Sequence, residues 1–311
     1  MTEVPAHLGA PFAEPRVCAI VVTYQPELPV LTPLLEQLDA AGCDFIVIDN
    51  GSSNSGEIQA VLNGKLHALG FIENGRNIGQ AAALNVALDK VKIHGHELAL
   101  LFDQDSSIGP DFVSRMLRAW GEAQRVKPDH VAAIGPRLVE PRSGRRMPFR
   151  TFHRLLEKKE TRVRADADLI ETAFLITSGS LISMVALGRI GAMRSDYFID
   201  NVDLEWCFRA RASGFELYGT DHATLQHRIG EDSSNPLVRH GIVVQHSALR
   251  YYYSTRNRLH LHQQPYTPTV WRIKDTTRFV LKSLYLLAVS RERKAFWLSL
   301  RRALRDVKQL T

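Results

Sequence analysis

Two hydrophobic patterns alternate along the first half of the chain. Runs of consecutive apolar, often β-branched residues cover 17–24, 45–48 and 98–102, which is typical of strands buried on both faces. Between them, leucines or alanines recur every three or four residues over 30–41 and 80–88, and this spacing predicts helices. The alternation predicts an α/β fold whose mostly parallel sheet is flanked by helices.

The second half is less regular. Residues 112–124 predict a further helix and 131–136 a further strand. Residues 137–168 are polar and strongly charged and contain proline and glycine, which favours a hairpin or an excursion that meets substrate. β character returns over 170–176, and a short helix is expected over 203–213 before Gly214.

Composition places the chain among ordinary globular proteins, with 45% hydrophobic and 23% charged residues. Three isolated cysteines indicate neither a zinc site nor a disulfide framework, and fit a reducing cytoplasm. Residues 1–15 carry three prolines and no basic segment followed by an apolar run. We therefore expect a flexible arm there rather than a signal peptide.

Positive charge is concentrated at the C-terminus. From residue 270 onward, eleven lysines and arginines oppose three acidic residues, a net charge of +8, whereas the whole chain carries +6. The body is therefore slightly acidic, and it shows no recognised nucleic-acid motif. This pattern suggests an anionic surface as partner of the tail and disfavours a nucleic-acid-binding protein, the non-enzyme alternative.

Candidate chemistry begins with Asp103 and Asp105, which follow the strand over 98–102. Ligands of open α/β sheets bind beyond the carboxyl ends of strands, and alternate residues of an extended segment point the same way. Two such carboxylates suit Mg²⁺ or Mn²⁺ held together with phosphate oxygens. The alternative is that both residues cap a loop or the following helix.

Asp49 likewise follows a predicted strand and is suited to a nucleobase or ribose, or to a simple Asx turn. Arg76 and Asn77 are suited to a pyrophosphate, and Gly79 would leave room for a ligand to approach backbone N–H groups. A tightly packed helix with a glycine-containing entry turn is the alternative. The glycine motifs of Walker ATPases and dinucleotide dehydrogenases do not occur.

A further acidic stretch surrounds Asp203. Asp203 lies at the start of a predicted helix, a position that suits a general base. The alternative is that Asp200 or Asp203 caps the N-terminus of this helix. Arg209 would then hold or orient one of the acids. His227 follows a short predicted strand and would complete a metal shell with Asp105, or serve a structural role.

Six segments occur in an order that resembles the inverting nucleotide-sugar glycosyltransferases of family 2, most closely their bacterial rhamnosyltransferases. They are residues 21–24, 48–52, 77–79, 102–106, 177–179 and 198–209. The resemblance covers about residues 16–265 and implies a GT-A fold, with a Rossmann-like mixed, mostly parallel sheet. We expect a flexible arm over 1–15, this domain over 16–265, and a basic amphipathic helical extension over 266–311.

The resemblance also implies roles for individual residues. Donor binding would involve Thr23, Tyr24, Asp49, Asn77, Gly79, Asp103 and Arg256. Asp105 and His227 would bind the metal, and Asp203 would be the base. Ser178, Gly179, Asp200, Glu205 and Arg209 would support the site or lie on the acceptor side. Val202 replaces the first acid of the family's usual Glu-Asp pair, so Asp200 and Glu205 stay alternatives for the base.

The implied reaction moves L-rhamnose from dTDP-L-rhamnose to a lipid-linked glycan in the synthesis of O-antigen or another surface polysaccharide, with inversion. A transferase of the same fold that uses another nucleotide sugar is the first alternative. A nucleotidyltransferase is the second, although a glycine- and lysine-rich phosphate loop does not follow the first strand.

The apolar positions of the tail are interrupted by Lys282 and fall short of the roughly 20 residues that span a bilayer. Leucines and aromatic residues mixed with arginines predict a helix on anionic lipid. This predicts a peripheral enzyme on the cytoplasmic face of the inner membrane. The alternative is a helical pair that packs on the domain or forms a homodimer.

Overall fold

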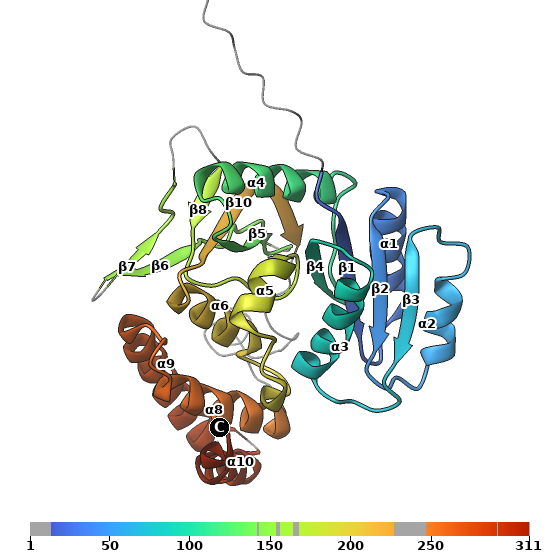
Figure 1. Cartoon of the computed structure of the whole chain (residues 1–311). Helices are drawn as coiled ribbons and strands as arrows, with labels where there is room; N and C mark the ends of the chain where they lie inside the picture. Colours follow the sequence, from blue (N-terminus) through green and yellow to red (C-terminus); the bar gives the residue numbers. More distant parts are fainter. Residues whose placement is uncertain are drawn as a thin grey trace, which may run out of the picture.

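One mixed sheet forms the centre of the molecule (Figure 1). The computed structural model describes residues 14–141, 143–153, 156–163, 168–226, 247–290 and 292–310. Within them, the sheet has eight strands in the order β3-β2-β1-β4-β9-β5-β10-β8. The strands are β1 (Val17–Thr23), β2 (Asp44–Asp49), β3 (Ala68–Glu73), β4 (Leu98–Asp103), β5 (Val131–Val139), β8 (Leu169–Glu171), β9 (Leu181–Ser183) and β10 (Glu216–Gln226).

Strand directions divide the sheet into two parts. Strands β3, β2, β1 and β4 are parallel to one another, and β9 runs antiparallel to both β4 and β5. Beyond it, β10 is parallel to β5 and β8 is antiparallel to β10. The predicted fold class, a mixed and mostly parallel sheet flanked by helices, is confirmed.

Helices cover both faces of this sheet. They are α1 (Leu28–Ala40), α2 (Ser55–Val61), α3 (Gln80–Ile93), α4 (Phe112–Val126), α5 (Met184–Ile190) and α6 (Val202–Ala212). Alternate residues of β1 belong to two hydrophobic clusters: Cys18 and Ile20 pack with α3, α5 and α6, while Ala19 and Val21 pack with α1, α2 and α4. This alternation is what a strand buried on both faces requires.

The strand register aligns three polar residues at one edge. Thr23 pairs with Asp49 across β1 and β2, and Val22 pairs with Asp103 across β1 and β4. The carboxyl ends of the three parallel strands therefore finish at the same level. This brings Thr23, Asp49 and Asp103 to one end of the sheet, as expected for an open α/β fold.

Several local expectations need correction. The segment after β2, for which no helix was predicted, contains α2. The predicted strand over 170–176 is limited to β8, an edge strand that pairs only with β10 among the named strands. The expected hairpin within 137–168 is present as β6 (Arg150–His153) paired with β7 (Leu156–Lys159).

The expected C-terminal extension over 266–311 is helical and contains α9 (Thr269–Val289) and α10 (Arg293–Asp306), which pack with α8 (Ala248–Gln263), the helix before it. Helix α8 joins the other two, because Tyr251 Oη hydrogen-bonds Ser283 Oγ at 2.8 Å and Tyr252 Oη donates to Asp306 Oδ2 at 3.0 Å. In Figure 1 the three helices lie together below the sheet, next to α6. In the described part of the chain, every helix is too short or too polar to cross a membrane.

Candidate active site

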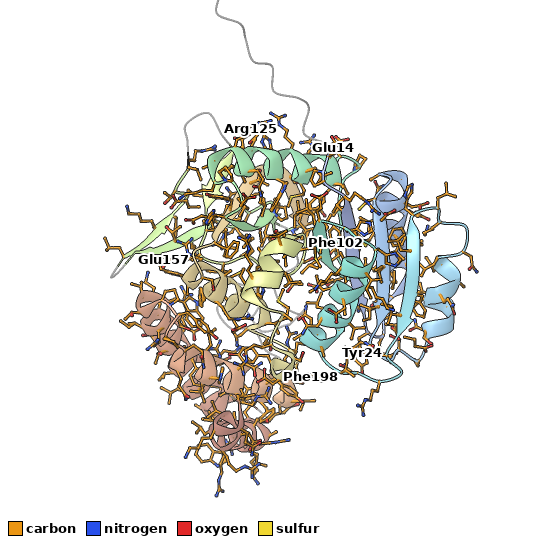
Figure 2. All side chains as sticks on the ribbon, viewed as in Figure 1. Glu14, Tyr24, Phe102, Arg125, Glu157 and Phe198 are labelled. Atoms are coloured by element: carbon orange, nitrogen blue, oxygen red, sulfur yellow. The ribbon has the colours of Figure 1, made fainter. Side chains whose placement is uncertain are left out.

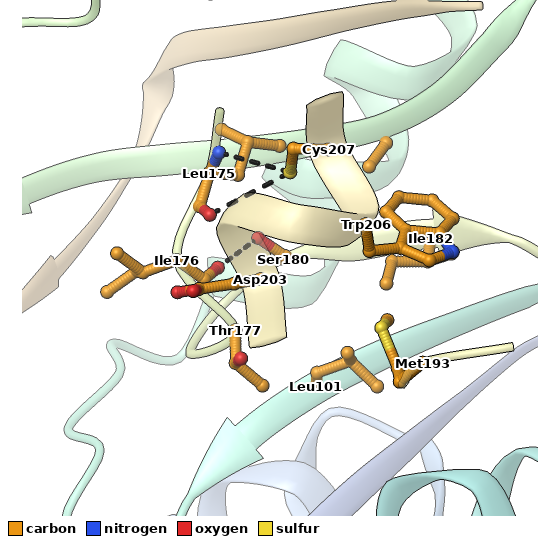
Figure 3. Close-up of a pocket in the computed structure, with 11 residues that line it drawn as sticks. Leu101, Leu175, Ile176, Thr177, Ser180, Ile182, Met193, Asp203, Trp206 and Cys207 are labelled. Carbon is orange, nitrogen blue, oxygen red and sulfur yellow. Dashed lines mark hydrogen bonds between the residues drawn. The ribbon is translucent and has the colours of Figure 1, made fainter. Parts of the chain in front are cut away.

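Asp203 lies in the first turn of α6 at the edge of a small apolar cavity (Figure 3). The cavity measures about 20 Å³, enough for one water molecule, and its lining includes Ile176, Met193 and Trp206. Burial raises the pKa of Asp203 to about 6, the charge of Asp200 adds to this, and backbone N–H groups, including that of Leu204 at 2.8 Å, oppose it. At neutral pH the carboxylate is ionised and is a stronger base than a free aspartate.

Glu205, an alternative candidate for the base, is paired within the protein. Its side chain is fully buried, and it binds the Arg209 guanidinium through contacts of 2.8 and 3.0 Å. Tyr266 donates a further hydrogen bond to Glu205 at 2.7 Å. Arg209 also donates to the carbonyls of Ile190 and Ala192. Arg209 therefore does hold an acid, as expected, but the pair anchors α6 to its neighbours and does not face substrate.

Asp200 is engaged in a different way. Its carboxylate binds Arg250 of α8 at 3.0–3.2 Å, which leaves Asp203 as the better base. The prediction that an aspartate side chain caps α6 is wrong for Asp200, because Asn201 occupies the N-cap position.

Asp103 and Asp105 form the other side of the site. Asp103 Oδ1 accepts a hydrogen bond from Gln80 Nε2 at 3.0 Å, and Asp105 is exposed. Burial raises the pKa of Asp103 to about 7, with further contributions from the negative charges of Asp105 and Asp203 and an opposing one from Gln80. Asp105 and Asp203 therefore each lie close enough to Asp103 for their charges to act on its carboxyl group. Asp105 also borders a cavity of about 460 Å³.

These residues fit a divalent cation. Mg²⁺ needs only one or two carboxylates when phosphate oxygens complete its shell, and a cation would relieve the repulsion that raises the pKa of Asp103. Among the described residues, no group of three or more His, Cys, Asp or Glu side chains is arranged to hold a metal on its own. His227, the other predicted ligand, lies outside the described residues.

Asp49 is fully buried at the end of β2, and the protein satisfies its carboxylate. Oδ1 accepts hydrogen bonds from the hydroxyls of Thr23 and Ser52, and Oδ2 accepts from the backbone N–H groups of Gly51 and Ser52. The expected Asx-type turn is thus present, and the residue shapes the loop that follows β2. Direct contact with a nucleobase stays a prediction.

Tyr24 follows β1 and is 48% exposed, so its ring is available to a ligand. Its backbone N–H donates to Gln104 Oε1 at 2.7 Å, which ties the end of β1 to the segment between Asp103 and Asp105. In Figure 2 the labelled Tyr24 lies near the lower ends of the strands on the right of the view, and Phe198 lies between it and the C-terminal helices.

Asn77 and Gly79 organise the entry to α3. Asn77 Oδ1 accepts hydrogen bonds from Gly79 N at 2.9 Å and from Asn50 Nδ2 at 3.0 Å. Gly79 has φ +88°, and a Cβ added there would lie 2.6 Å from the Phe198 ring and 2.7 Å from Phe198 Cα. The absent side chain therefore makes room for Phe198 rather than for a ligand, which corrects the expectation.

Ser178 and Gly179 brace the segment after β4. The Ser178 hydroxyl hydrogen-bonds that of Ser106, and Gly179 N donates to Leu101 O at 2.7 Å. A Cβ at Gly179 would approach Pro136 to 2.7 Å. Both residues thus position the strand end that carries Asp103 and Asp105, and a role toward the acceptor stays a prediction.

Arg256 faces the protein. Its guanidinium lies 5.1 Å from the Tyr253 ring centroid and donates to Asp196 O and to Asn257 Oδ1. Contact with a diphosphate is a prediction that would require these bonds to rearrange. Arg250 is a second cation near the carboxylates, because it contributes to lowering the pKa of Asp103.

Comparison with known proteins identifies the family. A sequence model described as Glycosyl transferase family 2 matches residues 18–191, more than half of the chain. The chain belongs to glycosyl transferase family 2. The segments from β1 through α5, including Asp49, Asp103 and Asp105, lie within the matched part of this glycosyltransferase.

One curated relative covers nearly the whole transferase. The dTDP-rhamnosyl transferase RfbF of Shigella flexneri is 26% identical over 278 residues, which are 89% of this chain and 90% of the relative. The predicted resemblance to family 2 rhamnosyltransferases is therefore confirmed at the level of the family and of a rhamnosyltransferase homologue.

Solved structures share the fold of the transferase at low identity. GalNAc-T7 with UDP, GalNAc and Mn²⁺ has a TM-score of 0.59 at 11% identity. The match covers 95% of this chain but only 57% of the GalNAc-T7 chain. The mannosyltransferase PcManGT from Pyrobaculum calidifontis with GDP-Man and Mn²⁺ has a TM-score of 0.57 at 15% identity. The match covers 99% of this chain and 80% of the PcManGT chain. TarS 1–349 of S. aureus with UDP-GlcNAc has a TM-score of 0.51 at 15% identity. The match covers 94% of this chain and 81% of the TarS chain.

Four residues of the site in the transferase were not anticipated. Gln80 binds Asp103, Asn50 binds Asn77, Arg250 binds Asp200, and Asn257 binds the loop before α6. Asn50 follows Asp49 and Gln80 follows Gly79, which were both predicted site residues, so their positions next to these residues could have indicated a role in the site. Arg250 is 50 residues from its partner in the chain.

Proposed function

We propose that this glycosyltransferase transfers L-rhamnose from dTDP-L-rhamnose to a hydroxyl of a lipid-linked glycan, with inversion, in the synthesis of a surface polysaccharide. The observation that carries the chemistry is the placement of Asp203 beside the end of β4: it lines the same small cavity as Leu101 of β4, the strand that ends at Asp103, and its charge acts on the Asp103 carboxyl group. The donor is supported by the rhamnosyltransferase relative, which aligns over nine-tenths of both chains.

In the proposed reaction, Asp203 removes the proton from the acceptor hydroxyl as that oxygen attacks the anomeric carbon. A base with a pKa near 6 is ionised at neutral pH and retains enough basicity for proton transfer in the transition state. The apolar residues beside it restrict access of bulk water, which favours the acceptor hydroxyl over hydrolysis.

Asp103 and Asp105 would hold a divalent metal together with the donor diphosphate. When bound, Mg²⁺ or Mn²⁺ would neutralise the charge that develops on the departing diphosphate. Gln80 fixes one oxygen of Asp103, and the bond between Tyr24 N and Gln104 fixes the segment that leads to Asp105. Both contacts orient the carboxylates before any ligand arrives.

The C-terminal helices are proposed to lie on an anionic membrane. Trp297 and Leu304 of α10 are 53% and 52% exposed, and Arg301 of α10 and Lys308, just past its end, are exposed as well. An exposed surface that combines an aromatic residue, a leucine and basic residues suits the headgroup region of anionic lipid. This would hold the enzyme at the cytoplasmic face of the inner membrane, near a lipid-linked acceptor.

Vesicle binding tests the membrane proposal. We expect the protein to sediment with vesicles that contain phosphatidylglycerol and not with phosphatidylcholine vesicles, and we expect Trp297→Glu to weaken that binding. Exposed Leu66, far from the tail in sequence, provides a matched Leu66→Glu control. Equal binding of both variants would refute the assigned face, and a stable dimer that Trp297→Glu dissociates would favour the dimer instead.

A donor panel tests the proposed reaction. Purified protein is incubated with dTDP-L-rhamnose, UDP-GlcNAc or GDP-mannose, with Mn²⁺ or EDTA, in the presence of lipid-linked acceptor extracted from membranes. We expect release of dTDP only from dTDP-L-rhamnose, and no release with EDTA. Release of UDP or GDP alone would keep the family but refute the donor.

A further inference from the structure

The loop that precedes α6 is held in an unfavourable backbone conformation. Phe198, Asp200 and Asn201 have φ values of 62°, 66° and 62°. Residues other than glycine rarely adopt a positive φ because Cβ then approaches the backbone; Asp and Asn tolerate it better than other residues, and Phe does not. Such a conformation persists only when the surrounding structure holds it.

Asn257 of α8 supplies that restraint. Its side chain is fully buried, and Nδ2 lies 2.7 Å from Tyr197 O, 2.8 Å from Ile199 O and 3.0 Å from Asp200 O. One amide group therefore gathers three carbonyls of the strained loop. Asparagine is a poor helix former, and a buried amide is costly unless hydrogen-bonded, so these contacts account for its presence in the middle of α8.

The same loop reaches the donor side of the site through Phe198. The Phe198 ring stacks on Tyr253 of α8, with centroids 4.6 Å apart and planes inclined by 16°. Its carbonyl accepts a hydrogen bond from Gln80 N at 2.6 Å, and the Gln80 side chain donates to Asp103. On its other side the loop ends at Asn201, which begins the helix that carries Asp203.

We propose that Asn257 is a positioning residue for sugar transfer: by holding the carbonyls of residues 197, 199 and 200, it sets the placement of Asp203 relative to Asp103. This inference rests on the proposed function of Asp203 as the base. Asn257 itself touches no reacting atom. Misplacing a base by about 1 Å can lower a rate by as much as 100-fold, whereas donor contacts at the ends of β1, β2 and β4 would stay intact.

Variants at two buried positions of α8 separate positioning from folding. Asn257→Ala removes the amide, and Asn257→Ser keeps one donor in case the alanine variant does not fold. Thr255→Val is the matched control, because Thr255 is fully buried on the same helix and its hydroxyl has no hydrogen-bond partner in the described structure. The measurements are kcat, the donor KM, and the affinity for dTDP with Mn²⁺.

We expect Asn257→Ala to lower kcat by 10- to 100-fold and Asn257→Ser by less, while the donor KM and the dTDP affinity, which the loss of the Arg256 bonds to Asn257 Oδ1 can affect, change by less than kcat does. Thr255→Val should keep kcat within twofold. Unchanged kcat in Asn257→Ala would overturn the proposal. A parallel loss of kcat and dTDP affinity would also overturn it, since a structural defect of the whole domain predicts that result.

Hydrogen exchange provides a second measurement that needs no substrate. We expect residues 196–206 to exchange faster in Asn257→Ala than in wild type, with β1 to β4 unchanged, and no difference in Thr255→Val. Equal protection of residues 196–206 in wild type and Asn257→Ala would overturn the proposal. Absence of turnover in the wild type with every donor would count against the proposed function instead, and the exchange result would still decide whether Asn257 holds the loop.

Discussion

Replacing Asp203 with asparagine should strongly slow transfer while making the folded protein more stable at neutral pH. Burial raises the pKa of Asp203 from 3.8 to about 6. A difference of about two pH units corresponds to about 3 kcal/mol at 1.36 kcal/mol per unit. Because Asp203 retains some contact with solvent, we expect about 1–3 kcal/mol.

The sign of this effect depends on pH. Between pH 3.8 and about 6 the folded state binds more protons at Asp203 than the unfolded state does, so the contribution of this residue to stability falls as pH rises. The asparagine side chain of the variant would carry no charge at any pH. The stabilisation of the Asp203→Asn variant should therefore be complete above about pH 6.5 and absent near pH 4.

Thermal unfolding without metal measures the difference. At roughly 2–4 °C per kcal/mol, the variant should melt about 2–12 °C above wild type at pH 7.5 and at the same temperature near pH 4. Its kcat should fall by about 10²–10⁴, the range for loss of a general base, with dTDP affinity retained. Glu205→Gln is the contrasting control, because breaking its buried pair with Arg209 should lower stability by about 3 kcal/mol.

A variant that transfers sugar normally would exclude Asp203 as the base. A melting difference that is the same at pH 4 and pH 7.5 would show that burial of charge is not its origin. Destabilisation at pH 7.5 would refute the reasoning altogether, since it would mean that the ionised carboxylate contributes favourable contacts which outweigh its desolvation.

Three further outcomes are expected. Asp105→Ala should abolish Mn²⁺-dependent binding of dTDP in calorimetry, and an unchanged titration would remove Asp105 from the metal site. Gly79→Ala should lower stability by about 2–4 kcal/mol in denaturant unfolding, because it combines a strained φ with overlap against Phe198, and a variant as stable as wild type would contradict that packing. The rate kcat/KM should fall tenfold per pH unit below about pH 6 as Asp203 is protonated, and a profile flat to pH 5 would argue for a different base.

The parallel part of the sheet was predictable because each of its central strands is a continuous apolar run. Such a run has one explanation in a soluble domain, and the polar residue that ends it, Asp49 or Asp103, marks the edge where a site forms. Strand β9 is different: the sequence over 177–183 suggested a strand with a tight bend, but three residues, Leu181–Ser183, are too few to predict its place between β4 and β5.

Side-chain roles around α6 were harder to predict. Asp203 and Glu205 are two residues apart and share the first turn, yet one borders the cavity and the other is buried against Arg209 and Tyr266. Which face of a short helix meets the protein depends on distant segments. Likewise, the contacts of Asn257 with residues 197–200 join parts of the chain almost 60 residues apart, which local patterns do not encode.

The position of β9 also affects how the chain assembles during synthesis. Strand β4 has β1 on one side and β9 on the other, but β9 is made about 80 residues after β4 ends. At roughly 5–20 residues per second, the free edge of β4 waits about 4–16 s for its partner. An unpaired edge of a hydrophobic strand is a template for pairing with other chains. Aggregation of nascent chains, and their capture by chaperones, should therefore be greatest for ribosome-bound fragments that end between β4 and β9.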